Sequence, residues 1–288
     1  MNKARVIAFY LPQYHPIPEN DKYWGKGFTE WTNVAKAKPL FRGHYQPHIP
    51  ADLGFYDLRL PEVREAQAEL ARDAGIEGFC YYHYWFGNGK MLLQKPFEEV
   101  LRLGKPDFPF CLCWANHDWT TKTWVKGSSM VNNTMIAQQE YLGEQDDIKH
   151  FEYCLRAFKD HRYITIEGKP IFLIYDPLSF PNVKEFMNRW NFLAKKNNLK
   201  GIYFIGVTTG RQSSYKIVTN LGFDGVCHNR RWEAEAKAAG FRFVRRMQSL
   251  LGWHLGISLM KYDYNKVVRN YDTPENKLEN CYPVITPG

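Results

Sequence analysis

The segment CLCWANHDWT, residues 111–120, joins an apolar run to a dense group of polar and aromatic residues. Trp114, Asn116, His117, Asp118 and Trp119 stand within six positions. Carboxylates and imidazoles are groups that transfer protons in catalysis, whereas indole rings stack on flat, partly polar ligands. A single segment of this kind is equally typical of a strand that enters a surface loop above packed tryptophans.

Other apolar runs end in the same combination, in YLPQYH at residues 10–15, YYHYWF at 81–86 and YDP at 175–177. Aromatic rings suit the apolar face of a sugar, and amides, imidazoles and carboxylates suit its hydroxyl groups. We therefore predict a glycan site. The predicted substrate-binding residues are Tyr10, Tyr14, His15, Trp31, Tyr82, His83, Tyr84, Trp85, Trp114, Asn116, His117 and Tyr175.

Glu30, Asp118 and Asp176 are the acidic residues that the sequence places near this site, and they are the candidate catalytic groups. Glycoside cleavage usually needs two carboxyl groups, about 5–5.5 Å apart for retention and about 6.5–9.5 Å apart for inversion. Each carboxylate also has a structural interpretation. Glu30 can bind backbone amides, Asp118 can cap its loop at Thr120 or Thr121, and Asp176 can form a turn.

A metal site is the competing interpretation of the histidines. His83, His117 and His228 could bind a metal together with Asp118 or Asp176. However, the sequence has no pair of histidines at alternating strand spacing and no H-x-x-x-H on a helix. Cys111 and Cys113 lie on one face of a strand without a second ligand pair, which favours packing. We predict neither a metal nor a cofactor.

The elements that must position these residues alternate between apolar runs and amphipathic stretches. Such alternation, with strands apolar on both faces, predicts a parallel sheet covered by helices. The expected helices lie in residues 60–76, 146–160 and 180–198. The expected strands are Arg5–Leu11, Gly78–Trp85, Phe108–Trp114, Pro170–Tyr175, Gly201–Val207, Gly225–His228 and Tyr282–Thr286.

The sequence lacks the glycine-rich motifs of nucleotide-binding sheets, so we favour an α/β fold of the (β/α)8 TIM-barrel type over an open sheet. We expect one barrel domain over residues 1–288, with a strand on each side of the N-terminal strand. Active sites of such barrels lie at the carboxyl ends of the strands, where the predicted site residues stand.

Composition narrows the classes of partner. The chain has 38 basic and 30 acidic residues and a net charge of +8, but its basic residues form no block interleaved with aromatics, so we expect no nucleic acid. No apolar run has the length of a membrane span. The six cysteines are expected to be reduced, and a cytoplasmic location follows from that and from the absence of a signal-like N-terminus.

Four segments resemble the WbsX-like proteins of bacterial polysaccharide loci: FYLPQYHPIPENDKYWGKGFTEWTNV, QPHIPADLGFYDLR, GFCYYHYWF and WANHDWT. Those proteins are relatives of the family 99 glycoside hydrolases, the endo-acting α-mannosidases and mannanases. The resemblance implies a (β/α)8 barrel and a role as a glycosyltransferase or in lipopolysaccharide biosynthesis. The related hydrolases retain anomeric configuration, which implies a carboxylate that assists the sugar 2-hydroxyl.

The sequence departs from the family where the family has Asn-Glu-Trp followed by Glu-Gly on its last barrel strand. Here the chain stops at YPVITPG, residues 282–288, which we interpret as strand seven. The chain therefore looks as though it lacks its strand-eight segment and could be inactive. We expect a glycoside hydrolase-like protein that acts on a bacterial surface polysaccharide or related glycan. The alternatives are a glycosyltransferase of O-antigen biosynthesis and a non-catalytic glycan-binding barrel; the oligomeric state is unknown.

Overall fold

The computed structural model describes residues 4–39, 41–121, 134–208, 214–239, 246–248, 250–251 and 262–286. Contacts between Cα atoms divide the chain into two compact units. Unit 1 comprises Met1–Thr32 and Pro50–Ile205, and unit 2 comprises Asn33–Ile49 and Gly206–Gly288. The single barrel domain expected over residues 1–288 remains a prediction.

Unit 1 is built on parallel strands that follow one another in chain order. The strands β1 (Ile7–Tyr10), β2 (Gly78–Trp85), β4 (Phe110–Trp114) and β8 (Lys169–Ile174) pair in parallel, and β9 (Tyr203–Val207) continues the order. Gly78 is needed where β2 begins, because a Cβ atom there would lie 2.5 Å from the Pro109 carbonyl oxygen. Among the described residues of this unit, β1 pairs with β2 alone, whereas the sequence predicts a strand on each side of it.

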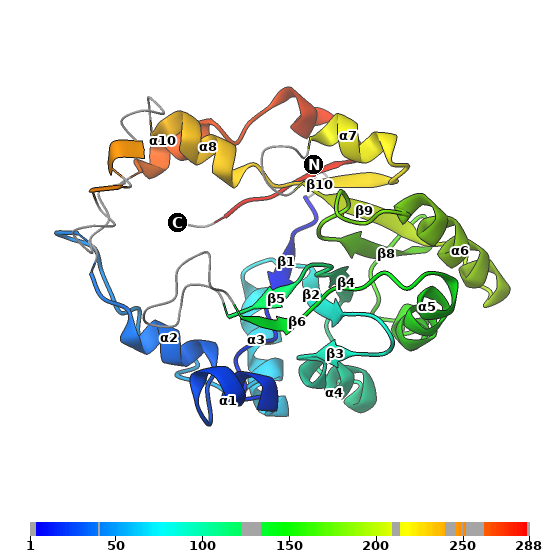
Figure 1. Cartoon of the computed structure of the whole chain (residues 1–288), viewed down its shortest axis with the longest axis horizontal. Helices are drawn as coiled ribbons and strands as arrows, with labels where there is room; N and C mark the ends of the chain where they lie inside the picture. Colours follow the sequence, from blue (N-terminus) through cyan, green and yellow to red (C-terminus); the bar gives the residue numbers. More distant parts are fainter. Residues whose placement is uncertain are drawn as a thin grey trace. The chain divides into compact units, whose positions relative to one another are not determined.

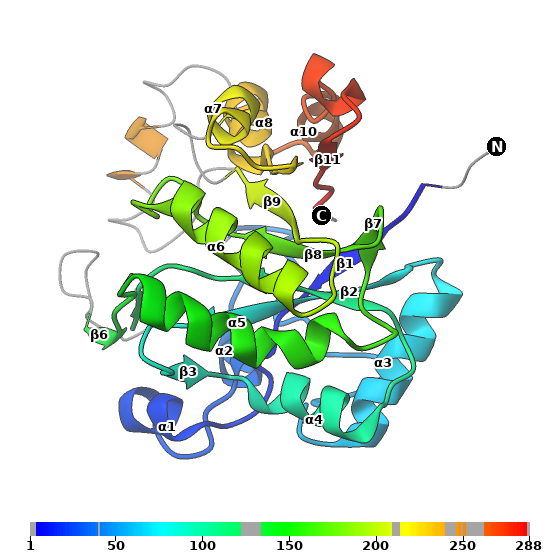
Figure 2. The same ribbon diagram turned by 90° about the vertical axis from the view of Figure 1, so that its right-hand side faces the viewer.

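Helices connect these strands and cover one face of the sheet (Figure 1). They are α3 (Pro61–Asp73), α4 (Lys95–Leu103), α5 (Glu144–Phe158) and α6 (Val183–Lys196), and Figure 2 shows α5 beside α6. A proline in the first turn of α3 and of α4 favours helix initiation, because proline has no N–H that would lack a partner there. The helices predicted for residues 60–76, 146–160 and 180–198 are thus confirmed as α3, α5 and α6.

The main core of unit 1 lies between the sheet and these helices. Trp190 of α6 packs against Phe172 of β8 with ring centroids 4.7 Å apart, and Phe186 packs against Trp190 at 4.6 Å. All three side chains are almost fully buried. Aromatic rings bury more area than other side chains, so this layer fixes the strands beneath it.

Short elements complete unit 1 at the ends of the strands. They are α1 (Pro18–Trp24), β3 (Met91–Leu92), which pairs antiparallel with β2, the β5 (Trp119–Thr120) and β6 (Met135–Ala137) ribbon, and β7 (Thr165–Ile166), which pairs with β8. The helix α2 (Glu30–Lys36) begins in unit 1 and continues into unit 2. None of the four short strands was predicted, because two or three residues carry no readable periodicity.

Unit 2 contains two further parallel strands, β10 (Gly225–His228) and β11 (Cys281–Pro283). The Thr208 N–H, directly after β9, donates to the Cys227 carbonyl of β10 at 3.0 Å. Its described residues include the helices α7 (Tyr215–Asn220), α8 (Arg231–Ala238) and α10 (Tyr264–Arg269) and the 3-10 helix η2 (Pro274–Lys277).

The strands and helices confirm the predicted α/β fold class, with a parallel sheet of the half-barrel kind and helices against it. Each of the seven predicted strand segments contains or overlaps an observed strand: β1, β2, β4, β8, β9, β10 and β11. No helix within the described ranges is long and apolar enough to cross a membrane.

Candidate functional site

Side chains of β2 alternate between two faces of the sheet. Tyr81 contacts Phe97 of α4, and His83 contacts His150 of α5, so odd-numbered residues point to the helices. Tyr82 and Tyr84 point to the opposite side, which we call the inner face. The alternation follows from strand geometry, in which successive side chains leave opposite faces.

The inner face carries a row of aromatic side chains near the carboxyl ends of the strands. Tyr82 stacks on Phe9 of β1 with ring centroids 5.4 Å apart and meets Tyr175, directly after β8, at 6.0 Å. His117, in the loop after β4, lies 5.4 Å from Tyr175. Tyr82, His117 and Tyr175 are half-buried, so each keeps accessible surface. Burial raises the pKa of Tyr82 and of Tyr175, which keeps both phenols protonated.

Glu30 lies beside the same face, in the first turn of α2. Burial and then the Glu30 carboxylate raise the pKa of Tyr14, and Glu30 also contributes to the raised pKa of Tyr84. Gln13 donates from its side chain to the Tyr84 hydroxyl at 3.2 Å. Gln13 and Tyr14 lie in the loop after β1, beside the inner face. Both are half-buried, and so is Glu30.

An aromatic group formed by Tyr14, Trp31 and Tyr56 supports Glu30. The rings of Tyr14 and Trp31 lie 4.6 Å apart, and those of Tyr14 and Tyr56 lie 5.5 Å apart. The Trp31 indole N–H donates to the Tyr56 carbonyl at 2.8 Å. These contacts fix the start of α2 and so the position of the Glu30 backbone.

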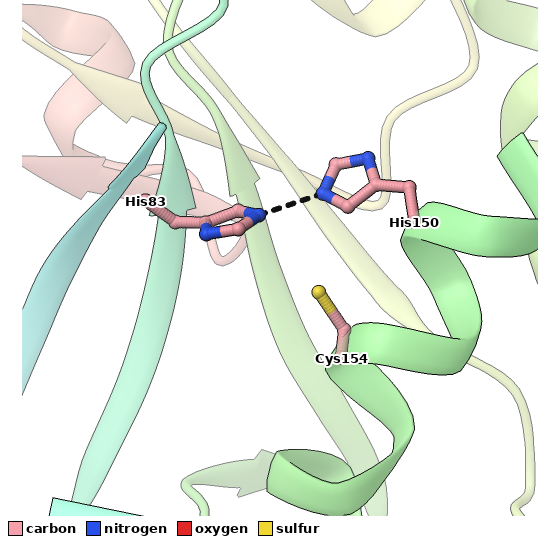
Figure 3. A group of neighbouring side chains, drawn as sticks. All are labelled: His83, His150 and Cys154. Atoms are coloured by element: carbon pink, nitrogen blue, oxygen red, sulfur yellow. Dashed lines mark hydrogen bonds between the residues drawn. The ribbon is translucent and has the colours of Figure 1, made fainter. Parts of the chain in front are cut away.

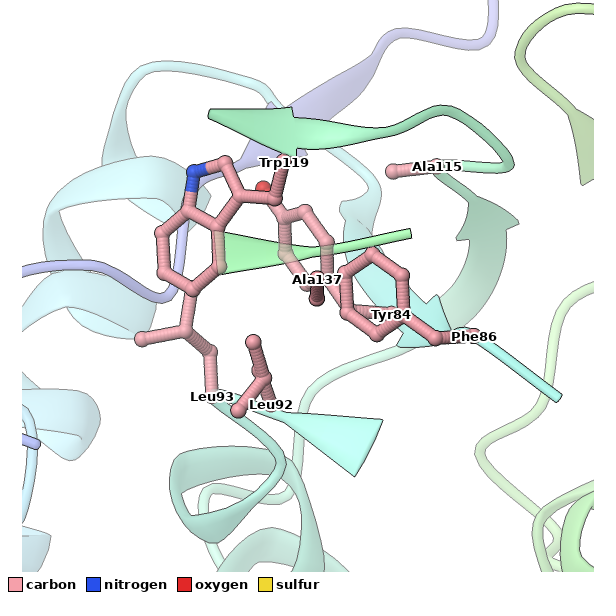
Figure 4. Close-up of a cluster of buried hydrophobic side chains, with 7 residues drawn as sticks. All are labelled: Tyr84, Phe86, Leu92, Leu93, Ala115, Trp119 and Ala137. Atoms are coloured by element: carbon pink, nitrogen blue, oxygen red, sulfur yellow. The ribbon is translucent and has the colours of Figure 1, made fainter. Parts of the chain in front are cut away.

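Tyr84 sits between the inner face and a small apolar cluster. Its ring stacks on Trp119 with centroids 6.0 Å apart, and Leu92, Leu93 and Ala137 pack around the pair (Figure 4). Tyr84 is 6% exposed, so its hydroxyl is the part that reaches Gln13. Tyr84 therefore supports the side chains of the inner face and exposes little surface of its own.

Four predicted site residues point to the helices instead. Tyr10 donates from its hydroxyl to the Gln67 side chain of α3 at 2.6 Å. Trp114 donates from its indole to the Trp85 carbonyl at 2.9 Å, and the Trp85 indole donates to Asp146 at 3.1 Å. His83 is buried against α5. These side chains belong to the core between sheet and helices and not to the inner face.

Asn116 and Asp176 lock two strand-end loops together. The Asn116 amide donates to the Asp176 carbonyl at 2.7 Å, and its oxygen accepts from the Asp176 N–H at 2.7 Å. The Asp176 carboxylate in turn accepts from the Ser179 hydroxyl at 2.7 Å. In this lock, the Asn116 amide that the sequence assigned to substrate binding and the Asp176 carboxylate that it assigned to catalysis already have partners in the protein.

Asp118 is exposed and accepts the Gln139 N–H at 2.7 Å. The sequence predicted that Asp118 caps its own loop at Thr120 or Thr121. Its carboxylate instead binds the backbone of Gln139, which lies 21 positions further along the chain. This bond joins the loop after β4 to the segment after β6, so this carboxylate positions a loop.

His15 lies apart from the inner face, in a polar pocket of about 330 Å³ that Arg59 and Lys95 also line. Its ring is 1% exposed. Neither ring nitrogen has a partner at hydrogen-bond geometry among the described residues, although the Pro12 carbonyl favours the protonated ring. Burial lowers the pKa of His15 to about 4, so the ring is neutral at pH 7.

His83, His150 and Cys154 form a group of possible metal ligands that sequence reasoning missed. Their ligand atoms all lie within 4.8 Å of one another, and all three side chains are buried. The group does not match an H-x-x-x-H pattern, because the spacing on α5 is H-x-x-x-C and the third ligand comes from β2. This spacing places His150 and Cys154 on one side of the helix.

Comparison of the sequence with known proteins finds a matching family and two similar proteins. A model of the family described as "Glycosyltransferase WbsX" matches residues 6–288. The chain is similar to the uncharacterized protein WxcX of Xanthomonas campestris pv. campestris, in strain B100 and in strain ATCC 33913, with 42% identity over 285 residues to each. The match covers 99% of this chain and 39% of each relative, so the chain spans well under half the length of these relatives.

Two solved structures share a weaker likeness. A GH99 endo-alpha-mannosidase from Bacteroides thetaiotaomicron is 16% identical, with a TM-score of 0.49, over 88% of this chain and 66% of that chain. A glycoside hydrolase-like protein is also 16% identical, with a TM-score of 0.46, over 78% of this chain and 58% of that chain.

Proposed function

The chain belongs to the WbsX glycosyltransferase family, and from this premise we propose that it is the glycan-binding part of a carbohydrate-active protein. The proposed ligand is a bacterial surface polysaccharide or a related glycan. One observation carries the proposal: Tyr82, His117 and Tyr175 form a half-buried row at the carboxyl ends of three parallel strands. In barrels of this type, ligands bind at that end.

The row offers what a sugar needs. Tyr82 and Tyr175 present ring faces and phenol groups, and His117 adds a ring nitrogen within the same row. Gln13 supplies an amide carbonyl oxygen, since its amide nitrogen already donates to Tyr84. A pyranose ring that stacks on Tyr175 would place its hydroxyl groups against these polar atoms.

Glu30 is the proposed catalytic carboxylate. It lies close enough to Tyr14 and Tyr84 to raise the pKa of both, and so stands beside the inner face. Asp118 and Asp176 accept hydrogen bonds from Gln139 and Ser179, so we assign them positioning roles. A retaining, hydrolase-like reaction would use Glu30 together with a second carboxyl group.

A glycosyltransferase is the second candidate, and the description of the family supports it. The two reactions differ in the donor: a transferase needs an activated sugar, whereas a hydrolase transfers the glycosyl group to water. A glycan-binding barrel without catalysis is the third. Location in the cytoplasm and the absence of nucleic acid as a partner remain predictions.

The first test is glycan binding by the 288-residue chain, measured by isothermal titration calorimetry with a panel of α-linked bacterial oligosaccharides. We expect weak binding of at least one glycan. Tyr175→Ala should weaken it about 2- to 13-fold, because a stacked aromatic contact contributes about 0.5–1.5 kcal/mol. Phe192→Ala is the matched control, since Phe192 is an exposed aromatic residue on α6. Equal losses in both variants, or no binding to any glycan, would contradict the proposal.

The second test separates the reactions. Glycan cleavage and glycan extension are measured for the same chain, with and without nucleotide sugars. We expect little or no turnover by the 288-residue chain alone. Cleavage that disappears in Glu30→Gln would make Glu30 part of a working hydrolase, whereas product formed with nucleotide sugars alone would replace the hydrolase by a transferase.

A further inference from the structure

The side of the unit 1 sheet that packs against the helices, which we call the helix face, holds a second set of chemically active side chains. His83 projects from β2, and His150 and Cys154 project from successive turns of α5 toward it (Figure 3). The Nε2 atoms of His83 and His150 are 2.8 Å apart. The Cys154 sulfur lies within 4.8 Å of the histidine ligand atoms. None of these residues faces the proposed glycan site.

We propose that His83, His150 and Cys154 form a binding site for a soft monovalent metal ion, Cu(I). Thiolate ligands select Cu(I) and Zn(II), and imidazole suits both metals. The ligands come from a strand and a helix that the core already holds together, so the site is largely preorganised. The inference stands on the helix face alone and does not rest on glycan binding.

Burial and charge favour Cu(I) over Zn(II). His83, His150 and Cys154 are 5%, 1% and 0% exposed. A thiolate with Cu(I) makes a site of zero net charge, whereas a thiolate with Zn(II) leaves one positive charge. An uncompensated charge is costly in an apolar interior. Within the described chain, the group of possible ligands contains no carboxylate that would balance it.

The surroundings are aromatic. Trp85 stacks on His150 with centroids 4.7 Å apart and planes 4° from parallel, and Trp114 meets His150 edge-on at 4.7 Å. Tyr153 stacks on His83 at 5.5 Å. These rings pack against both imidazoles and limit the positions that they can take.

Binding changes protons but transfers no electrons. In the hydrogen-bonded pair one Nε2 carries a proton, which must pass to Nδ1 of its own ring so that both Nε2 lone pairs can bind the metal. The Cys154 thiol loses its proton to solvent as the copper–sulfur bond forms. Because the Cys154 thiol gives up its proton when the copper–sulfur bond forms, metal binding is expected to release about one proton per copper ion. Two nitrogens bound at about 2.0–2.1 Å to one three-coordinate metal lie roughly 3.5 Å apart, so the two Nε2 atoms, now 2.8 Å apart, must separate by about 0.7 Å.

The test is anaerobic titration of the 288-residue chain with Cu(I) in competition with a chromophoric chelator. We expect one tightly bound copper per chain and at least a tenfold loss of affinity in Cys154→Ala and in His150→Gln. Cys281→Ala is the matched control, because Cys281 is a buried cysteine of unit 2 outside the group. Equal affinities of Cys154→Ala and Cys281→Ala would overturn the assignment, and so would failure of the unsubstituted chain to compete for copper.

X-ray absorption of the copper-loaded, unsubstituted chain keeps the test decisive if a variant fails to fold. The expected first shell has two nitrogens and one sulfur. A shell of two sulfurs would place copper elsewhere, since Cys80 and Cys111 lie close enough to interact. Equally tight binding of Zn(II) would overturn the choice of a monovalent ion. None of these outcomes depends on whether the chain binds a glycan.

Discussion

The inner face and the helix face of unit 1 both carry aromatic residues but present them differently. On the helix face, Trp85 and Trp114 are 3% and 2% exposed, and their indole N–H groups donate within the protein. On the inner face, Tyr82 and Tyr175 are half-buried and keep accessible rings. The comparison teaches that aromatic content identifies the strands, whereas exposure decides which aromatic residues can meet a ligand.

The first prediction tests whether the two faces contribute differently to the free energy of unfolding, and it has the largest expected effect. Trp114→Ala removes a buried indole that packs against Phe186 with centroids 5.5 Å apart. We expect a loss of about 3–5 kcal/mol in the free energy of unfolding, because the cavity collapses only partly. Tyr175→Ala on the inner face should cost clearly less. Urea denaturation measures both, and equal losses would show that the inner face is also core.

The second prediction concerns the lock between the loops after β4 and β8. Asn116→Ala leaves the N–H and carbonyl groups of Asp176 without their partner. We expect a loss of about 2–3 kcal/mol in the free energy of unfolding, from the penalty of unsatisfied, partly buried backbone groups. Asn188→Ala, at an exposed position of α6, is the control and should change little. Thermal or urea unfolding decides, and a loss no greater than that of the control would mean that water replaces the lock.

The third prediction concerns pH. The pKa of His15 is lowered to about 4 by burial, with Arg59 and Lys95 acting in the same direction and Asp57 against it. A lowered histidine pKa stabilises the folded state above the unfolded pKa of about 6.5, and that contribution is lost as pH falls toward 4. We expect the unsubstituted chain to lose about 1–3 kcal/mol more between pH 7 and pH 4 than His15→Gln does.

The matched control for that measurement is His161→Gln, since the His161 side chain is 83% exposed. Urea unfolding of each variant at several pH values gives the slope of stability against pH. If His15→Gln and His161→Gln have the same slope, His15 titrates in the folded state as it does in the unfolded chain, and the pocket does not exclude its charge.

The period-2 geometry of a strand is readable from the sequence, and along β2 it sends Tyr82 and Tyr84 to one face and His83 and Trp85 to the other. The segment YYHYWF, residues 81–86, therefore cannot present all of its side chains to one ligand. The sequence does not indicate which face of β2 packs against the helices, because both faces are apolar and aromatic. The seven strands were readable, since apolar runs with turn residues between them determine a parallel sheet.

The sequence could not predict contacts between segments that lie far apart in the chain. Asn116 meets the backbone of Asp176, and Asp118 meets Gln139, through loops whose course no local pattern predicts. His83 meets His150 from an element 67 positions away. The H-x-x-x-C spacing of His150 and Cys154 was a usable signal, but its third ligand comes from a strand that the spacing does not specify.

Hydrogen–deuterium exchange of the 288-residue chain, with and without a saturating α-linked oligosaccharide, tests most directly whether the inner face is the glycan site. We predict slower exchange in the loops after β1, β4 and β8, at residues 11–17, 115–118 and 175–179, and unchanged exchange in α5 and α6 on the helix face. Protection confined to α5 and α6, or no protection in those loops while calorimetry shows the glycan bound, would contradict the assignment of the inner face.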